Sequence, residues 1–554
     1  MTAATVPAHD PVEAGPAGSG ALTHRQIMVV LSGLLLGMFL AALDQTVVST
    51  AMKTIADRLD GQTAQAWVTT SYLITSTITT PLYGKLSDMY GRKPFYLFAI
   101  AIFVVGSVLC GTAGSIYELA VYRAVQGVGA GGLLSLAFAI VGDLVPPRER
   151  GRYQAYFMSV FGLSSVLGPI VGGAFAGAGT VAGIEGWRWI FYVNVPLGVL
   201  AYVVVSRKLH LPRSSSAHRL DFVGAALLTL SVVPFLLLAE KGRDWGWSSP
   251  LSLGLLALSV AALTSFIPWE RRMGEEAILP LRMFQSSVVS LTSIISLLVG
   301  VGMFGGIVSL PLYLQIVRGA SPTGAGLQLV PLMVGIILTG AIAGSYMRRT
   351  GHYRILPILG TATMFVAMAL LSTLHVDTPL WRTMTFTTVL GAGLGMTMQT
   401  LVLSVQNALP AKDMGVATSS VSFFRSLGGT FGAAIALAVL FGSVIGNIRD
   451  RAVAAGLPAD VIARFSDKAS LNDTSIIATL PPALRRSVLE GFADSFSSVF
   501  LTVAVLLVPA FVLTLFVKEL PLRSRGGIEA ASEEERAQRE VAQRELTQAE
   551  STVV

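Results

Sequence analysis

Charged side chains are scarce in this sequence: Asp, Glu, Lys and Arg make up only 13% of its 554 residues. A soluble protein usually carries about twice that fraction, so the water-facing surfaces of soluble domains could not be covered. Cysteine is almost absent, and the single Cys110 excludes a disulfide scaffold and any cysteine-ligated zinc or iron–sulfur site. The six histidines show no metal-ligand spacing, and there is no Gly-x(4)-Gly-Lys-Ser/Thr loop to cradle nucleotide phosphates. We therefore expect no metal, no cofactor and no use of ATP, and, because no catalytic constellation occurs, no enzyme activity.

Apolar residues, in contrast, are abundant and occur in long runs. Hydrophobic side chains account for 53% of the chain, far more than a disordered protein contains. A membrane-spanning helix needs about 20 mostly apolar residues, whereas a barrel strand alternates over about ten. Fourteen runs meet the helical requirement: 27–50, 65–84, 95–112, 117–142, 153–177, 187–206, 220–240, 251–268, 286–312, 323–346, 355–373, 381–405, 416–440 and 497–517. The sequence therefore predicts an all-α polytopic membrane protein with 14 spans.

The basic residues predict the orientation of these spans. If the N-terminus lies inside, the short cytoplasmic loops hold 17 Lys or Arg and the short outer loops hold seven. Cytoplasmic loops carry the excess of positive charge in membrane proteins, so we expect both termini to be cytoplasmic. The basic residues behind the formal net charge of +7 recur at alternate loops. A protein that binds nucleic acid would instead gather them on one folded face. We interpret residues 1–24 as a disordered cytoplasmic tail and residues 521–554 as a charged one.

One loop pattern occurs twice and indicates an internal repeat. The loop after the second run places Gly84 and Gly91 seven residues apart, and the loop after the tenth run spaces Gly344 and Gly351 in the same way. Basic residues follow in both copies, but only the first copy contains an aspartate, Asp88. Internal repeats are typical of secondary transporters, whose substrate cavity lies between the two halves.

Five segments resemble motifs of a known family. The loop at 84–93 (GKLSDMYGRK) resembles the G-x-L-x-D-x-x-G-R-K signature of the major facilitator superfamily, and residues 123–131 (RAVQGVGAG) resemble its R-x-x-Q-G-x-G element. Residues 162–173 (GLSSVLGPIVGG) resemble the G-x(5)-G-P-x-x-G-G element of its antiporters. Residues 43–48 (LDQTVV) and 187–196 (WRWIFYVNVP) are similar to the fourteen-helix drug:proton antiporter branch. The resemblance covers about residues 27–520.

The resemblance implies a major facilitator fold of two six-helix bundles plus two extra transmembrane helices. We assign the N-terminal bundle to 25–206, a linker with the extra helices to 207–285, and the C-terminal bundle to 286–520. Within the last of these we predict a long extracellular loop over 441–496. In it Leu484, Val488 and Phe492 recur at four-residue spacing, which indicates a helix on the membrane surface, either a lid over the outer mouth or an inert interfacial helix.

Asp44 is the only carboxylate well inside a predicted span. An ionisable residue at membrane depth is costly and therefore points to function. Arg123, an intramembrane cation in the same half, is its natural partner. A carboxylate that moves between a desolvated environment and a cation takes up and releases a proton, which would make Asp44 and Arg123 the proton-coupling pair, as the resemblance also implies. The alternative is a permanent ion pair that only locks two helices together.

The resemblance places a cytoplasmic gate at the first repeated loop and at the end of the fourth run, with Gly84, Asp88, Gly91, Arg92 and Asp143. Asp88 can pair with Arg92 or face the positive end of a helix, which by resemblance is the helix that starts near Gly415. Such a contact must break during alternating access. The alternative is a surface charge cluster that stabilises little.

The antiporter motif of the fifth run consists of Gly162, Gly168, Pro169, Gly172 and Gly173. Glycine permits close helix contact, and a proline inside a helix removes a backbone donor and bends the span. The resemblance links this bend to antiport, because it limits proton leak. A simple packing kink would have the same sequence.

Substrate contacts are expected from aromatic, methionine and polar side chains on the runs that would line a central cavity. The candidates are Tyr72, Phe157, Phe161, Phe304, Tyr313, Gln315, Met396, Gln399, Phe423 and Arg425. Each of the apolar candidates alternatively packs in the core or faces lipid. Arg425 has no acid in its own span, so it either neutralises helix carbonyl ends or faces the cavity. Related exporters that handle doubly charged cations often carry extra acids around this region, and this chain has none there, so the resemblance argues against a strongly dicationic substrate.

These features predict a proton-coupled antiporter that exports hydrophobic or amphipathic drugs or antibiotics across a bacterial cytoplasmic membrane, with the proton gradient as its energy source. Its expected partners are the small substrate, protons and the lipid bilayer, without nucleic acid, and we expect a monomer. One alternative keeps the fold but exports an endogenous lipid or a self-made natural product. A non-transporting membrane sensor is disfavoured, because the chain offers no soluble output domain.

Overall fold

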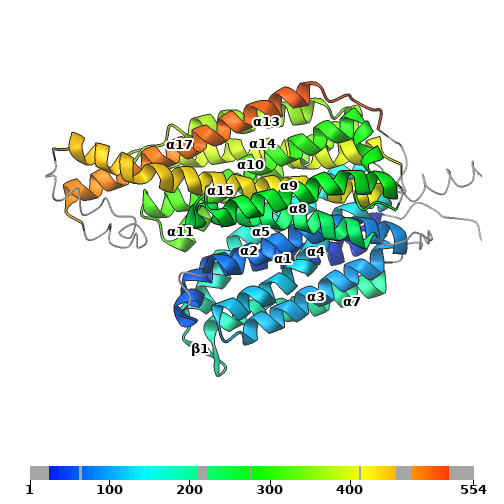
Figure 1. Cartoon of the computed structure of the whole chain (residues 1–554), viewed down its shortest axis with the longest axis horizontal. Coiled ribbons are helices and arrows are strands. Elements are labelled where there is room, and N and C mark those ends of the chain that lie inside the picture. Colours follow the sequence, from blue (N-terminus) through cyan, green and yellow to red (C-terminus); the bar gives the residue numbers. More distant parts are fainter. Residues whose placement is uncertain are drawn as a thin grey trace, which may run out of the picture.

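The computed structural model describes residues 24–60, 65–145, 147–209, 221–274, 276–410, 413–456, 477 and 480–522. In this part of the chain, fourteen helices of at least 15 residues run side by side along the long axis of the molecule (Figure 1). The predicted all-helical class is confirmed there, apart from one small hairpin of β1 (Thr180–Val181) and β2 (Ile184–Glu185). The predicted tails 1–24 and 521–554 lie almost wholly outside the described residues.

The first helical group forms the lower half of Figure 1, drawn in blue and cyan. Helix α1 packs against α4, α5 and α7, and helix α4 packs against α2 and α3. Two short turns, η2 (Gly186–Arg188) and α6 (Trp189–Tyr192), connect the hairpin to α7. The group consists of α1 (His24–Arg58), α2 (Gln65–Tyr90), α3 (Arg92–Thr112), α4 (Ile116–Leu144), α5 (Pro147–Gly177) and α7 (Asn194–Lys208).

The second helical group forms the upper half of Figure 1, from green to red. Helix α10 packs against α14, α15 and α17, and α14 also packs against α12 and α13. The group consists of α10 (Ser287–Ile316), α12 (Val330–Thr350), α13 (Ile355–Leu371), α14 (Leu380–Ala408), α15 (Met414–Ala454) and α17 (Pro482–Leu515), with the short η3 (Leu281–Gln285) and α11 (Pro322–Gln328). Across the groups, α15 contacts α2 and α4, and α12 contacts α5.

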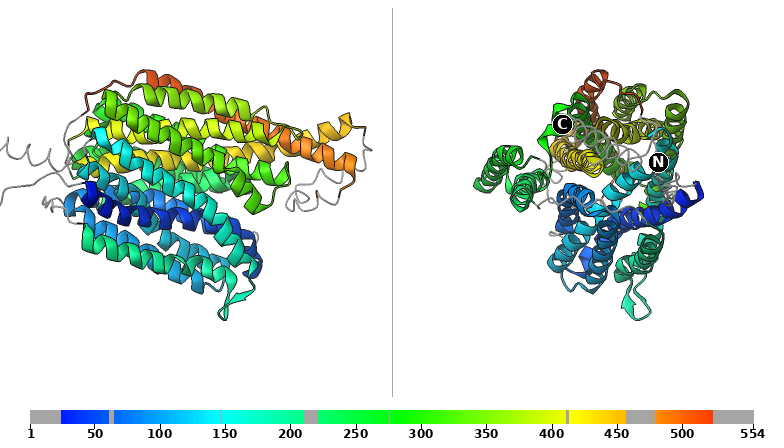
Figure 2. Two further views of the ribbon diagram at one scale, coloured as in Figure 1. Left: turned by 180° about the vertical axis from the view of Figure 1, so that it is seen from behind. Right: turned by 90° about the vertical axis from the view of Figure 1, so that its right-hand side faces the viewer.

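Two further helices, α8 (Phe222–Trp245) and α9 (Pro250–Met273), pack against each other and are called the accessory pair below. They project from one side of the molecule in the right-hand view of Figure 2. Helix α8 contacts α2 of the first group and α15 of the second. The accessory pair is therefore placed where it can respond to movement between the two groups.

Eleven described segments are long and apolar enough to cross a membrane, and α8 and α13 carry shorter apolar stretches. Helix α2 is more polar because it contains nine Ser or Thr residues. Two of its hydroxyls bond to α4: Ser71 Oγ donates to the Ala120 carbonyl at 2.7 Å, and Thr80 Oγ1 donates to the Gly131 carbonyl at 3.3 Å. The fourteen long helices are thus present, while the number of membrane spans stays a prediction.

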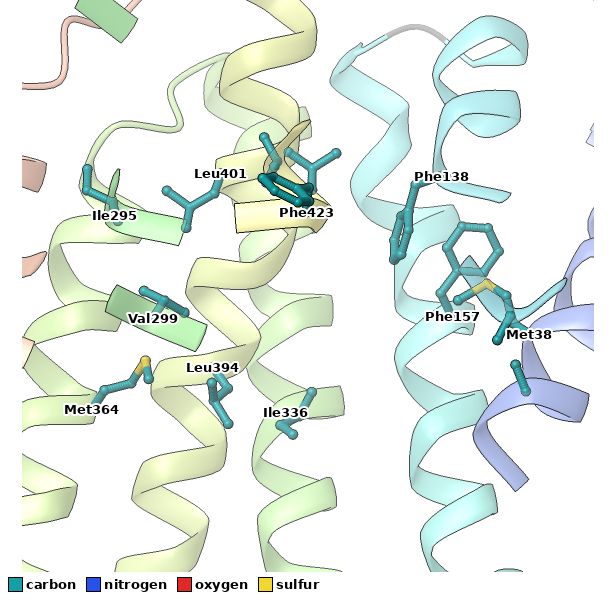
Figure 3. Packing of buried hydrophobic residues seen from close by; sticks show 14 of the residues in the cluster. Met38, Phe138, Phe157, Ile295, Val299, Ile336, Met364, Leu394, Leu401 and Phe423 are labelled. Atoms are coloured by element: carbon teal, nitrogen blue, oxygen red, sulfur yellow. The ribbon is translucent and has the colours of Figure 1, made fainter. Parts of the chain in front are cut away.

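Each helical group has its own buried side chains, which Figure 3 shows from close by. Phe138 and Phe157 meet edge to face in the first group, with ring centroids 5.1 Å apart, and Met38 lies beside them. Val299 and Leu394 are among the buried residues of the second group. Small residues at the helix contacts permit this packing in the absence of a strong hydrophobic driving force within lipid.

The predicted loop at 441–496 is wrong at both of its ends. Helix α15 continues to Ala454 and α17 already begins at Pro482, and the two extend beyond their neighbours at the left of Figure 1. Leu484, Val488 and Phe492 are at most 5% exposed because α17 packs against α15. The apolar stripe therefore faces a protein helix rather than a membrane surface. Residues 457–476 lie outside the described part.

Candidate functional site

A buried polar network surrounds Asp44 in the middle of α1. Its Oδ2 accepts a hydrogen bond from Arg123 Nη1 of α4 at 2.5 Å, and both side chains are at most 1% exposed. Its Oδ1 accepts from Gln126 Nε2 at 2.9 Å and from Asn194 Nδ2 at 2.8 Å. The structure thus brings together the two charged residues that the sequence singled out.

Neutral side chains complete this network, and sequence reasoning did not assign them to the site. Gln126 Oε1 accepts from Arg123 Nη1 at 2.6 Å, and Gln126 Nε2 also donates to Ser107 Oγ at 2.6 Å. Ser107 Oγ accepts from Asn194 Nδ2 at 3.2 Å as well. Gln126 and Asn194 lie within two of the motifs that resemble the family, so membership of those motifs could have indicated them as site residues. Ser107 lies in no motif.

Arg123 is held on the other sides of its guanidinium too. Its Nε donates to the Val68 carbonyl of α2 at 3.4 Å, and its Cζ lies 4.1 Å from the ring centroid of Tyr72. A buried ion pair is compensated only when its remaining donors and acceptors are satisfied, and removal of one partner alone costs about 3–5 kcal/mol. The buried ion pair of Asp44 and Arg123 is therefore stable only while α1, α4 and α7 keep this arrangement.

A second polar cluster, called the latch below, joins the two helical groups. It consists of Asp88 and Arg92, Asp143 of α4 and the first turn of α15. Asp88 accepts from the backbone amides of Gly415 at 2.9 Å and Val416 at 2.8 Å and pairs with Arg92. Arg92 Nε bonds to Asp143 Oδ2 at 2.7 Å.

The first turn of α15 depends on this contact between the groups. Its N-cap residue, Asp413, makes no capping hydrogen bond and instead accepts from Arg282 Nη2 at 3.1 Å. A helix start leaves backbone donors that need an acceptor, and a carboxylate there also meets the positive end of the helix dipole. Asp88 supplies that acceptor from the other group, so the latch opens only when α15 loses its cap.

Two glycines of the predicted gate have visible structural reasons. Gly91 has φ +95° at the N-cap of α3, a backbone conformation that favours glycine. A Cβ atom at Gly84 would overlap Ser419 Oγ and lie 2.9 Å from the Gly415 carbonyl. Helices α2 and α15 can therefore approach this closely only without a side chain at position 84.

Both described ends of the chain lie at the latch end of the molecule. Near the start of α1, a Cβ atom at Gly33 would contact Val205 of α7, and Lys93 Nζ at the start of α3 donates to the Ser206 carbonyl at 2.7 Å. At the other terminus, Asn407 Nδ2 near the end of α14 donates to the Pro521 carbonyl at 3.0 Å. The two termini therefore share one side, and which side of the membrane this is stays a prediction.

Burial raises the pKa of Asp88 to about 6, although the Arg92 guanidinium acts in the opposite direction. A carboxyl group in water has a pKa of about 3.9, so the closed latch binds a proton more tightly than the open one. The closed form therefore gains stability as the pH falls through 6 and loses that gain as the pH rises toward 7, by at most about 3 kcal/mol.

We expect the latch to open measurably when the pH at this end is raised from 5 to 7. Spin labels at the exposed positions Tyr90 and Thr350, one in each group, would report the change by pulsed electron resonance. In Asp88→Asn the group is neutral throughout, so the distance distribution should not respond to pH in that range. A response of equal size in Asp88→Asn would show that another group controls the latch.

The predicted antiporter motif lies where α5 meets both α1 and the second group. Cβ atoms at Gly168 and Gly172 would contact Thr46 and Val47, two and three residues after Asp44. Thr46 Oγ1 also donates to the Ser164 carbonyl of α5 at 3.0 Å.

On its other side the motif touches the second group. A Cβ atom at Gly162 would lie 3.1 Å from Ile337 Cδ1 of α12, and one at Gly326 of α11 would lie 2.8 Å from Pro169 Cγ. Gly173 is exposed and so does not serve a close contact. Helix α5 therefore links the surroundings of Asp44 to the other half of the molecule.

The predicted substrate candidates do not form one set. Tyr72, Phe157, Tyr313, Gln399 and Phe423 are at most 4% exposed. Tyr72 stacks on Arg123, Phe157 packs against Phe138, and Tyr313 donates to the His375 carbonyl at 3.1 Å. These three are accounted for by packing. The other five candidates are partly exposed: Phe161, Phe304, Gln315, Met396 and Arg425.

A pocket that the sequence did not indicate lies between the accessory pair and the second group. Its lining is apolar and includes Phe235 of α8, Trp247 of the turn between α8 and α9, and Phe431 of α15. Phe235 and Phe431 meet edge to face, with centroids 4.8 Å apart. It contains none of the predicted substrate candidates.

The family model of the Major Facilitator Superfamily matches residues 34–433. Among curated relatives, the multidrug transporter protein MdtP of Bacillus subtilis is 33% identical over 531 residues, which cover 92% of this chain and 96% of the relative. Multidrug resistance protein 3 of the same organism is 33% identical over 497 residues, covering 88% of this chain and 94% of the relative. The MFS-type efflux pump LUC4 of Fusarium is 32% identical, covering 91% and 90%.

Solved structures show the same fold at lower sequence identity. The proton:xylose symporter XylE aligns with a TM-score of 0.59 at 17% identity, covering 92% of this chain and 99% of that chain. The human organic anion transporter MFSD10 aligns with a TM-score of 0.57 at 16% identity, covering 88% and 99%. These likenesses concern the arrangement of the helices alone.

Proposed function

Because the chain belongs to the major facilitator superfamily and is a transporter of that type, we propose that it is a proton-coupled antiporter. It exports hydrophobic or amphipathic drugs, or antibiotics, across the cytoplasmic membrane of a bacterium. The relatives named as multidrug transporters and efflux pumps support the direction and the kind of cargo. The proton gradient is the energy source, and the protein acts as a monomer with both termini in the cytoplasm.

The observation that carries this proposal is the ion pair of Asp44 and Arg123, buried inside one helical group and held by neutral donors. While Arg123 lies against it, Asp44 is stabilised as a carboxylate. If α4 moves relative to α1, the carboxylate loses its cation in a desolvated site and takes up a proton. When the pair forms again, that proton leaves from the same oxygen. A carrier needs such a pair of states.

The contacts of α5 couple this exchange to the rest of the molecule. Its glycines touch α1 directly after Asp44, and its other face touches α11 and α12. A change of position between α1 and α5 is therefore felt by the second group, which the latch holds at one end through Asp88 and α15. Opening the latch while the opposite end closes is the rocking movement that alternating access requires.

The proposal is tested with inside-out membrane vesicles that contain the protein and have an acidic interior. A neutral amphipathic dye should accumulate inside the vesicles only while the proton gradient lasts. The uptake of each dye molecule should be accompanied by the release of protons from the vesicle interior. Vesicles with the same lipid but without the protein are the control. Accumulation that survives a protonophore, or dye movement with no proton release, would overturn proton-coupled antiport.

A further inference from the structure

Two buried acids at the latch end of the accessory pair have no role in the transport mechanism described above. Asp221 caps α8: its Oδ1 accepts from the Gly224 amide at 2.7 Å and from Trp269 Nε1 at 2.8 Å. Glu270 lies in the last turn of α9, and its Oε2 accepts from the Leu279 amide at 3.1 Å. Each carboxyl group thus uses only one of its oxygens.

The two remaining oxygens are buried on either side of one point, next to Gly224. Asp221 Oδ2 and Glu270 Oε1 are buried and have no hydrogen-bonding partner, and the residues are 5% and 1% exposed. A Cβ atom at Gly224 would overlap Asp221 Oδ2 and lie 2.7 Å from Glu270 Oε1, so both oxygens approach the same point. Two carboxylates that share a buried site cannot both stay ionised without a large cost.

The charged groups around this pair come from three neighbouring elements. The residues concerned are Lys85 of α2, Arg282 of η3 and Asp413 at the start of α15. Lys85 interacts electrostatically with Glu270, but also with Asp88, Asp413 and Arg282. Arg282 is bound to Asp413, and both oxygens in question lack any donor. Neither Lys85 nor Arg282 therefore donates a hydrogen bond to the two oxygens, although the charge of Lys85 partly offsets that of Glu270.

We propose that Asp221 and Glu270 share one proton and form a second proton-binding site, separate from Asp44, at the base of the accessory pair. The O–H of one carboxyl group donates to the facing oxygen of the other, so the pair carries one negative charge instead of two. When the proton leaves to water, the second negative charge appears near Lys85, beside Asp88 of the latch. The site thereby connects the protonation of the accessory pair to the contact between the two halves.

The proposal does not depend on drug export and is tested on the full chain in lipid nanodiscs by infrared difference spectroscopy at neutral pH. The wild type should show the C=O stretch of one buried protonated carboxyl group. Glu270→Gln and Asp221→Asn should each remove it, because the new amide donates to the remaining carboxylate and replaces the proton. Asp44→Asn should leave the band in place. A band that persists in both amide variants, or is missing from the wild type and Asp44→Asn, overturns the shared proton.

Thermal unfolding gives a second readout that keeps the test decisive if one variant folds poorly. Glu270→Gln should be at least as stable as the wild type, since its amide satisfies Asp221 Oδ2. Glu270→Ala should be less stable, because it leaves that oxygen buried without a donor. If the alanine variant is as stable as the glutamine variant, the two side chains share no hydrogen bond and the proposal fails.

Discussion

Replacement of Asp44 by asparagine is expected to abolish uphill export while leaving the helical groups assembled. Asparagine has the size of aspartate and keeps one oxygen that can accept hydrogen bonds from the neighbouring donors. It cannot exchange a proton. Arg123 retains Gln126 Oε1 at 2.6 Å, the Val68 carbonyl and the face of Tyr72, so its charge is not left without contacts. One coupled proton supplies about 2.3 kcal/mol per 100 mV, which corresponds to about a fiftyfold gradient of a neutral substrate. In Asp44→Asn this gradient should fall to unity.

The measurement is the ratio of the dye concentration inside the inside-out vesicles to that outside, at steady state under an imposed proton gradient. Glu118→Gln is the matched control, because Glu118 is an exposed acid on the same helix as Arg123 and lies outside the network. Downhill exchange of dye should continue in Asp44→Asn, which separates a lost proton carrier from a lost substrate site. If Asp44→Asn still concentrates dye, Asp44 is not the carrier and the ion pair only locks two helices.

The pairing of Asp44 with Arg123 could be predicted because charges are so rare inside the apolar runs that few partners exist. The same argument fails for Ser107, because serine is common in spanning helices and its position in the sequence does not show which helix it faces. Gln126 and Asn194 lie 82 and 150 residues from Asp44. Only the fold brings these amides to its carboxylate.

The segment 441–496 shows a second limit. An apolar stripe at four-residue spacing indicates that one face of a helix is buried. It does not indicate whether lipid or another helix covers that face. Here the cover is α15, because a Cβ atom at Gly491 would contact Ile448, and Arg451 bonds to Asp494 at 2.7 and 2.9 Å. The substrate candidates stay a prediction and show the same limit, since residue type alone does not separate a buried side chain such as Phe157 from one on a cavity wall.

The contact of Asp88 with α15 was expected from family resemblance, whereas the dependence of that contact on glycine emerges from the structure. Gly84 lies between the groups rather than within one, since its missing Cβ makes room for Ser419 and for the Gly415 carbonyl. A larger residue at position 84 therefore leaves each group intact but separates the helices that close the latch. Among the described glycines, Gly254 of the accessory pair has nothing within 4 Å of such a Cβ atom, and so provides a matched control.

Gly84→Val is expected to hold the latch open and to stop export. Forcing methyl groups into a packed contact costs about 1–3 kcal/mol, which lowers the population of the closed form by about 5- to 150-fold. Spin labels at Tyr90 and Thr350 should report longer distances at every pH in Gly84→Val and unchanged distances in Gly254→Val, with export lost only in the former. Because Asp88 can no longer cap α15 in the open form, Asp88→Asn should add little to the defect of Gly84→Val. An additive loss, or a closed latch in Gly84→Val, would mean that α2 and α15 do not have to meet for the transport cycle.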